Sequence, residues 1–169
     1  METIIMIRHG EKPKMGLGQL NSEGLNRSLA LPKYFLKNYP KADYIFAPDP
    51  TQLHYEHHGD KKKHFYIRPL ATIEPTAILL NLPVNLSVGV NNYQKLVTKL
   101  LKDKYHNSVI YVAWEHSQII EIAKHFFSIF KVNNIHLPDW DGGDYDTVFI
   151  FNINWNTHKL DFKIAQQEL

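Results

Sequence analysis

Four basic side chains at separate points of the chain have the chemistry to bind an oxyanion. Arg8 and His9 come directly after an apolar run, His116 follows another such run, and Arg68 follows a long polar segment. Guanidinium groups match tetrahedral oxyanions with paired N–H donors, and an imidazole can donate a hydrogen bond or attack as a nucleophile. Together these residue types predict a binding site for a phosphoryl group.

Two apolar runs have to bring these side chains together. Residues 3–7 and 108–113 are nearly continuous apolar segments, which is typical of strands buried on both faces of a sheet. Ligands in open α/β sheets bind at the carboxyl ends of the strands. We therefore expect His9 and His116, which follow these two strands, to meet at one edge of the sheet.

Strand and helix signals alternate along the rest of the chain. The sequence predicts helices over residues 21–36, 69–80, 92–105 and 117–130, and further strands over residues 43–47, 84–88, 148–153 and 160–164. Ser117 is a candidate N-cap for the last helix. The alternation predicts an α/β fold, a three-layer sandwich with a mostly parallel central sheet and helices on both faces. The last strand alternates apolar and polar residues, which favours an edge position.

The first predicted helix has a clear start and a regular apolar pattern. Asn21 is a good N-cap. Leu25, Leu29 and Leu36 repeat with Pro32 at helical spacing and predict the apolar face of this helix. Because proline lacks an N–H group and clashes with the preceding turn, we expect Pro32 to kink or shorten the helix.

Length and composition exclude several classes of protein. The 169 residues predict a single domain over residues 1–169. The net charge of +2 is too balanced for a dedicated nucleic-acid-binding protein. No stretch is long and apolar enough to span a membrane, and the uncharged segment before Arg8 is too short for a signal peptide. Together with the absence of cysteine, these features predict a cytoplasmic protein without membrane or nucleic-acid partners, and they leave its oligomeric state open.

Residues 51–66 are polar and rich in histidine and lysine, which predicts a surface loop. His57 and His58 beside Asp60 suggest metal ligands, but their spacing matches no established site. We therefore expect no metal and no other cofactor. The lysines of residues 61–63 could instead steer an acidic or polyphosphorylated substrate toward the site.

Four short motifs occur in an order that resembles the histidine phosphatase superfamily, whose members have the phosphoglycerate mutase-like fold. Residues 8–10 form its Arg-His-Gly triplet after the first strand, and residues 20–24 are similar to its Leu-Thr-x-x-Gly helix start. Residues 68–72 look like its Arg-Ala-x-x-Thr block, and residues 109–116 resemble its late strand that ends in a second histidine. One triplet alone is a weak signal, whereas four motifs in the right order are specific.

The resemblance implies a two-step phosphoryl transfer. His9 would attack phosphorus through a neutral ring nitrogen, and water would then hydrolyse the phosphohistidine. The other ring nitrogen is expected to donate to a backbone carbonyl, which fixes the tautomer. Arg8, Arg68 and His116 are expected to hold the non-bridging oxygens and stabilise the transition state, so that no metal is needed.

The group that protonates the leaving group departs from the family's patterns. One branch has a glutamate in the stretch that corresponds to residues 86–93, which contains no carboxylate here, and another has an aspartate at the position of Ser117. Glu115 is our expected proton donor, with neutralisation of a nearby basic residue as its alternative role. Glu11 and the aspartates of residues 139–144 are the other candidates.

These observations predict a metal-independent phosphatase that hydrolyses a phosphomonoester, either a small molecule or a phosphoprotein, through a phosphohistidine intermediate on His9. The alternative is a phosphate-binding module of the same fold with little or no turnover, because the family's usual proton donor is missing.

Overall fold

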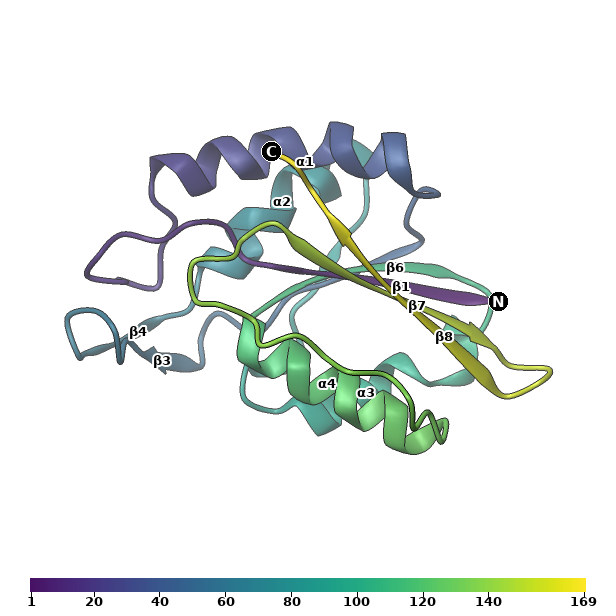
Figure 1. The fold of residues 1–169 in the computed structure, drawn as a ribbon. Coiled ribbons are helices and arrows are strands. Elements are labelled where there is room, and N and C mark those ends of the chain that lie inside the picture. The colour runs from purple at the N-terminus through teal and green to yellow at the C-terminus, as the bar shows by residue number, and fades with distance from the viewer.

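The computed structural model describes residues 1–169 and consists of a six-stranded sheet between two layers of helices, with a small separate hairpin (Figure 1). The elements in chain order are β1 (Glu2–Arg8), α1 (Ser22–Asn38), β2 (Tyr44–Phe46), β3 (Leu53–Tyr55), β4 (Lys63–Phe65), α2 (Arg68–Leu80), β5 (Val84–Asn85), α3 (Tyr93–Leu100), the 3₁₀ turn η1 (Asp103–Tyr105), β6 (Val109–Trp114), α4 (His116–Ile129), β7 (Thr147–Asn154) and β8 (Lys159–Gln166). None of the helices is long and apolar enough to cross a membrane.

The strand order of the main sheet is β5-β2-β6-β1-β7-β8. Strands β5, β2, β6 and β1 are parallel, and β7 runs antiparallel to β1 and to the edge strand β8. Helices α1 and α2 cover one face of the sheet, while α3 and α4 cover the other (Figure 1). The expected sandwich with a mostly parallel sheet is therefore confirmed, as is the edge position of the last strand.

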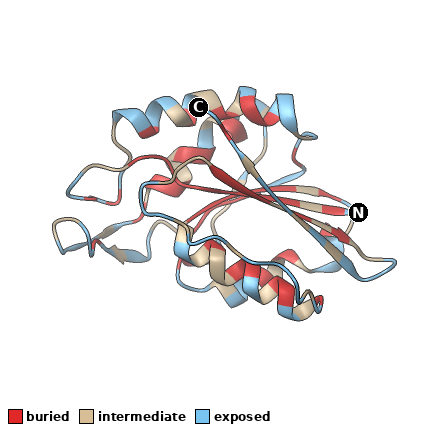
Figure 2. Cartoon of the chain, in the orientation of Figure 1, coloured by how far each residue is buried: buried red, intermediate tan, exposed pale blue.

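The central strands β1 and β6 end at the same edge of the sheet. Their register pairs Ile7 with Ala113 and Arg8 with Trp114, and the His9 amide donates to the Trp114 carbonyl at 3.0 Å. Both strands are buried on both faces, as Figure 2 shows for the middle of the sheet. This register brings the residues after the two strands, including His9, next to the start of α4.

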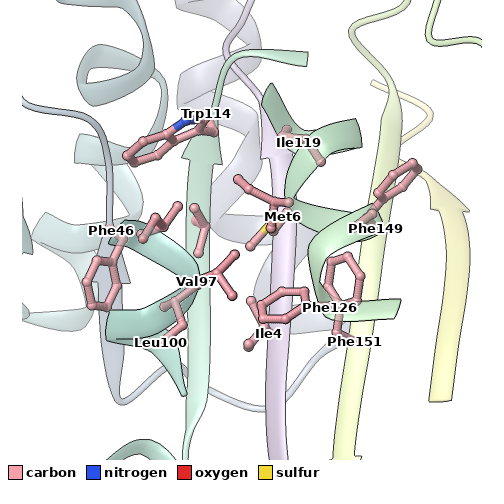
Figure 3. Packing of buried hydrophobic residues seen from close by; sticks show 14 of the residues in the cluster. Ile4, Met6, Phe46, Val97, Leu100, Trp114, Ile119, Phe126, Phe149 and Phe151 are labelled. Atoms are coloured by element: carbon pink, nitrogen blue, oxygen red, sulfur yellow. The ribbon is translucent and has the colours of Figure 1, made fainter. Parts of the chain in front are cut away.

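Two apolar clusters hold the layers together. The larger one joins α3 and α4 to the sheet, and Figure 3 shows Val97 and Phe126 packing against Ile4 and Met6 of β1. The smaller one joins α1 and α2 to the opposite face. Burial of these side chains supplies the main stabilising free energy and fixes the strand ends that carry the site.

Helix α1 differs from its predicted orientation. Its N-cap is Asn21, as expected, and the helix continues through Pro32 to Asn38. The predicted apolar face, however, is exposed, with Leu29 at 62%. The buried residues of the helix are Gly24, Ser28, Leu31, Tyr34 and Phe35.

Close approach at Gly24 explains this rotation of α1. A Cβ atom at position 24 would lie 2.3 Å from the Glu11 carbonyl oxygen, so the chain after β1 can pass here only over a glycine. The contact turns the face of Gly24 and Ser28 toward the sheet. The apolar repeat of the leucines therefore faces solvent.

Several boundaries also differ from the sequence prediction. The segment 51–66, predicted as a surface loop, contains the β3–β4 hairpin (residues 53–65). The predicted helix over 92–105 ends at Leu100 and is followed by η1, and the predicted strand over 84–88 is reduced to β5. Glu115, rather than Ser117, is the N-cap of α4.

Candidate active site

A cavity of about 780 Å³ lies at the carboxyl ends of β1 and β6. All five site residues predicted from the sequence line it, namely Arg8, His9, Arg68, Glu115 and His116. The β3–β4 hairpin forms another part of the wall. Side chains from β1, α2 and the start of α4, which are far apart in the sequence, thus meet in one polar cavity.

His9 is buried and its ring is held in one tautomer. The Nδ1 atom lies 2.8 Å from the Gly10 carbonyl oxygen, and Nε2 accepts a hydrogen bond from Arg68 Nε at 3.3 Å. Because Arg68 Nε can only donate, Nε2 is unprotonated and Nδ1 carries the proton. Burial lowers the pKa of His9 well below its usual value, and the positive charges of Arg68 and Arg8 lower it further. The ring is therefore neutral, with the lone pair of Nε2 directed at Arg68.

The Arg-x-x-x-Thr spacing in α2 has a structural reason. Thr72 lies one turn after Arg68 and donates to its carbonyl at 2.7 Å, while the Thr72 hydroxyl accepts the Gly10 amide at 2.8 Å. This hydroxyl joins the first turn of α2 to the residue after the histidine. It therefore fixes His9 and Arg68 relative to each other.

Arg68 forms a buried ion pair that the sequence analysis missed. Glu56, 1% exposed, accepts two hydrogen bonds from the Arg68 guanidinium, at 2.7 and 3.0 Å, and a third from the Gly18 amide at 2.9 Å. Burial raises the pKa of Glu56, but the hydrogen bonds and charge of Arg68 outweigh it and lower the pKa. Glu56 follows β3, where exposed residues alternate with inward-facing ones. The sequence carried no signal for this, because the apolar residues of β3, Leu53 and Tyr55, occupy the exposed positions and an apolar-inward interpretation would have placed Glu56 outside.

Arg8 is positioned by the acidic loop before β7. Its Nη1 atom donates to the carbonyls of Gly142 and Asp144 at 2.8 and 2.9 Å, and its guanidinium lies 4.0 Å from the centre of the Tyr145 ring. The Nε atom of Arg8 is buried without a protein partner. The aspartates of this loop stabilise its turns, since Asp144 accepts from the backbone of Asp146 and Thr147.

Glu115 caps α4 and contacts His116. Its carboxylate accepts the amides of Ser117 and Gln118 at 3.1 and 3.0 Å, and lies 2.6 Å from His116 Nδ1. Burial raises the pKa of Glu115, but the close contact with His116 and the hydrogen bonds from Ser117 outweigh it and hold the pKa far below its usual range. An ionised carboxylate has no proton to give. The contacts of Glu115 therefore argue against the proton-donor role expected from the sequence.

The other carboxylates considered from the sequence do not reach the cavity. Glu11 is bound to Arg27, whose Nε and Nη2 atoms donate to it at 2.8 to 3.0 Å. Glu11 and Asp144 line a separate shallow hollow. In this hollow Arg27 also forms an ion pair with Asp146. Glu11 and Asp146 thus hold Arg27 of α1, while the Asp144 side chain stabilises the loop whose carbonyls bind Arg8.

The structure contains no group of three or more histidine, aspartate or glutamate side chains arranged to hold a metal ion. His57 and His58 line the cavity, whereas Asp60 is bound to His64 at 2.8 Å within the hairpin. The ligand set suggested by the sequence is therefore not assembled.

No family model matches the sequence, and no curated protein matches it either. Solved structures do resemble it. A phosphoserine phosphatase from Entamoeba histolytica has a TM-score of 0.60 at 12% identity, with 99% of this chain and 98% of that chain covered. A mycobacterial glucosyl-3-phosphoglycerate phosphatase has a TM-score of 0.62 at 11% identity, with 98% of both chains covered. A phosphoglycerate mutase from Plasmodium falciparum has a TM-score of 0.58 at 13% identity, covering 98% and 90%.

These likenesses extend over nearly the whole chain and over nearly the whole of each matched protein. At such low identity they are evidence of a shared fold. The chain thus has the phosphoglycerate mutase-like fold that the ordered motifs predicted.

Proposed function

We propose that this protein is a phosphatase that hydrolyses a phosphomonoester through a phosphohistidine intermediate on His9. The observation that carries the proposal is the neutral tautomer of His9 in a basic cavity. Nδ1 carries the proton and donates it in a hydrogen bond to the Gly10 carbonyl, which leaves the Nε2 lone pair available for attack. The known activities of proteins with similar folds, which include a phosphoserine phosphatase, favour the same reaction class.

In the first step, Nε2 of His9 forms a bond to phosphorus while the bond from phosphorus to the leaving oxygen breaks. The leaving oxygen departs as an anion and takes its proton from solvent water. In the second step, water attacks phosphorus and gives up a proton to solvent, the bond to His9 breaks with its electron pair returning to Nε2, and inorganic phosphate departs. The hydrogen bond from Arg68 Nε to His9 has to be exchanged for one to a phosphoryl oxygen, because the same lone pair forms the new bond.

Arg8, Arg68 and His116 are the proposed phosphoryl-binding residues. The Nη1 and Nη2 groups of Arg68 are bound to Glu56. The Nε–H group of Arg68 is therefore the donor directed at the reacting centre. The unpaired Nε of buried Arg8 is a second donor. These fixed charges can stabilise the transition state as a metal ion would, which supports a metal-independent reaction.

Phosphate binding without turnover is the second candidate. The two carboxylates of the cavity, Glu56 and Glu115, are both held ionised by their hydrogen bonds, so neither supplies a proton to a poor leaving group. A phosphatase with this site is expected to favour esters whose leaving groups depart without protonation, such as 4-nitrophenyl phosphate.

The test is hydrolysis of 4-nitrophenyl phosphate in the presence of a chelator. We expect turnover by the parent protein, acid-labile phosphate on its histidine, and a loss on the order of 10³-fold or more in His9→Ala. His136→Ala, at an exposed histidine outside the cavity, is the matched control and should keep parental activity. Equal rates in His9→Ala and the parent would refute the nucleophile. A parent that binds vanadate but hydrolyses no ester would establish the binding module.

A further inference from the structure

The mouth of the cavity carries basic side chains that the proposed phosphoryl transfer does not use. Lys12 follows β1, and His57 and His58 form the turn of the β3–β4 hairpin. All three line the same cavity as His9. His57 and His58 are exposed whereas His9 is 2% exposed, so they lie toward solvent from the reacting centre.

The carboxylates of the cavity are engaged mainly elsewhere, and Lys12 has only a long ion pair with Glu56. The Glu56 oxygens are engaged by Arg68 and Gly18, and Lys12 Nζ approaches them no closer than 3.9 Å. Glu115 is engaged at the start of α4. Among the side chains that line the cavity, the cations Arg8, Lys12 and Arg68 outnumber the carboxylates Glu56 and Glu115.

The environment of Lys12 is consistent with this excess. Burial lowers the pKa of Lys12, and the positive charge of Arg68 lowers it further, with only partial opposition from Glu56. A bound anion would relieve this repulsion. Because the side chain is only partly exposed, solvent screens the repulsion less than it would at an open surface.

The hairpin that presents His57 and His58 is fixed in place. Asp60 donates its amide to the Met15 carbonyl at 3.0 Å and accepts from His64 at 2.8 Å. His54 stacks on the buried Tyr66 ring with centroids 4.3 Å apart. The histidines at the turn are thus held over the cavity by contacts at both ends of the hairpin, which reduces the entropy lost when they bind a ligand.

We propose that Lys12, His57 and His58 form a second anion subsite, and that the substrate is a phosphomonoester whose leaving group carries another negatively charged group, a carboxylate or a phosphate. The proposal rests on the proposed function for the phosphoryl end of the substrate. The lysines of residues 61–63, which the sequence suggested for steering, are exposed and do not line the cavity. They can add long-range attraction but make no contact that selects the second group.

Binding of two phosphonates tests the subsite independently of turnover. Benzylphosphonate and 4-carboxybenzylphosphonate differ only in the second anionic group, and their dissociation constants can be measured by calorimetry at low salt. We expect the carboxylated ligand to bind the parent about 10-fold more tightly. Lys12→Met and the double variant His57→Gln/His58→Gln should each bring the ratio toward 1. Lys63→Met, which removes a charge from the hairpin outside the cavity, is the matched control and should keep the parental ratio.

The outcomes separate the two proposals. Equal affinities in a parent that hydrolyses 4-nitrophenyl phosphate would overturn the subsite alone. A preference for the carboxylated ligand in a parent that hydrolyses no ester would support the subsite and overturn the proposed turnover. If Lys63→Met loses as much of the preference for the carboxylated ligand as Lys12→Met does, the preference comes from long-range electrostatic attraction, which would overturn the subsite. Binding of neither phosphonate would overturn both. The exposed histidine pair keeps the test decisive if Lys12→Met does not fold.

Discussion

Glu115 illustrates how a single carboxylate changes its role with its hydrogen-bond partners. Its position between a strand and a histidine suggested a proton donor, which requires a protonated carboxyl group. In the structure two α4 amides and His116 surround it. These contacts stabilise the charged form, so Glu115 is better suited to orient His116 and to cap the helix.

A capping and orienting role predicts how Glu115→Gln should behave. Loss of the charged cap and of the contact to His116 should slow hydrolysis of benzyl phosphate and 4-nitrophenyl phosphate by the same factor, about 10-fold, and destabilise the fold by about 1 kcal/mol. Steady-state kinetics with both esters and thermal unfolding measure these effects. A much larger slowdown for benzyl phosphate, the ester with the poorer leaving group, would restore the proton-donor role.

Helix α1 shows that an apolar repeat does not by itself identify the buried face. Leu25, Leu29 and Leu36 repeat correctly but are exposed, while Leu31 is fully buried. The buried face begins at Gly24, where the chain after β1 passes too close for any side chain. Backbone approach therefore determined the rotation of this helix, and the exposed leucines follow from it.

The rotation of α1 can be tested with a matched pair of substitutions. Leu31→Ala should lower the free energy of unfolding by about 2–4 kcal/mol, because it leaves a cavity against the sheet. Leu29→Ala, on the exposed face, should change it by less than about 0.5 kcal/mol. Chemical denaturation of both variants is the measurement. The reverse order would support the face predicted from the sequence.

The β3–β4 hairpin is the element that differs most from its sequence-based prediction. Its composition is that of a solvated loop, and most of its residues are indeed exposed or half-buried. One inward position, Glu56, nevertheless forms the buried ion pair with Arg68. The charged residues 60–63 predict exposure of their own segment but do not predict burial of Glu56, because its partner Arg68 lies in a separate element, α2.

At the scale of the whole molecule, folding stability should depend on the ionisation of Glu2. This carboxyl is buried at the start of the central strand, where it accepts from Trp155 Nε1 at 2.8 Å and has one oxygen without a partner. Burial raises the pKa of Glu2 from its ordinary value of 4.5 to about 8, against the opposing effects of the Trp155 hydrogen bond and the N-terminal charge. The folded protein therefore keeps a proton that the unfolded chain has lost.

The sign of the pH effect follows from proton binding. Between pH 4.5 and about 8 the folded state binds more protons than the unfolded state, so this residue makes stability fall as pH rises. Glu2→Gln removes the effect and should stabilise the protein at pH 8 relative to the parent, on the order of 1–3 kcal/mol, with little gain at pH 4.5. Thermal unfolding at both pH values measures it. Equal shifts at the two pH values would contradict the assignment.

The sequence by itself determined the order of the main-sheet strands and of the four helices, and the residues at the central strand ends. Continuous apolar runs predicted buried strands, and His9 and His116 follow two that the sheet pairs directly with each other. Helix starts such as Asn21 were readable because capping depends on neighbours in the sequence. These features are local, and local patterns encode periodicity and caps.

Only the tertiary structure decided which face of α1 is buried, that Glu56 reaches Arg68, and that Glu115 caps α4 and contacts His116. It also placed His57 and His58 over the cavity. Each of these outcomes depends on a close approach of backbones, on exclusion of water, or on a partner from another element. Such properties arise when the layers pack, and a pattern along the chain does not contain them.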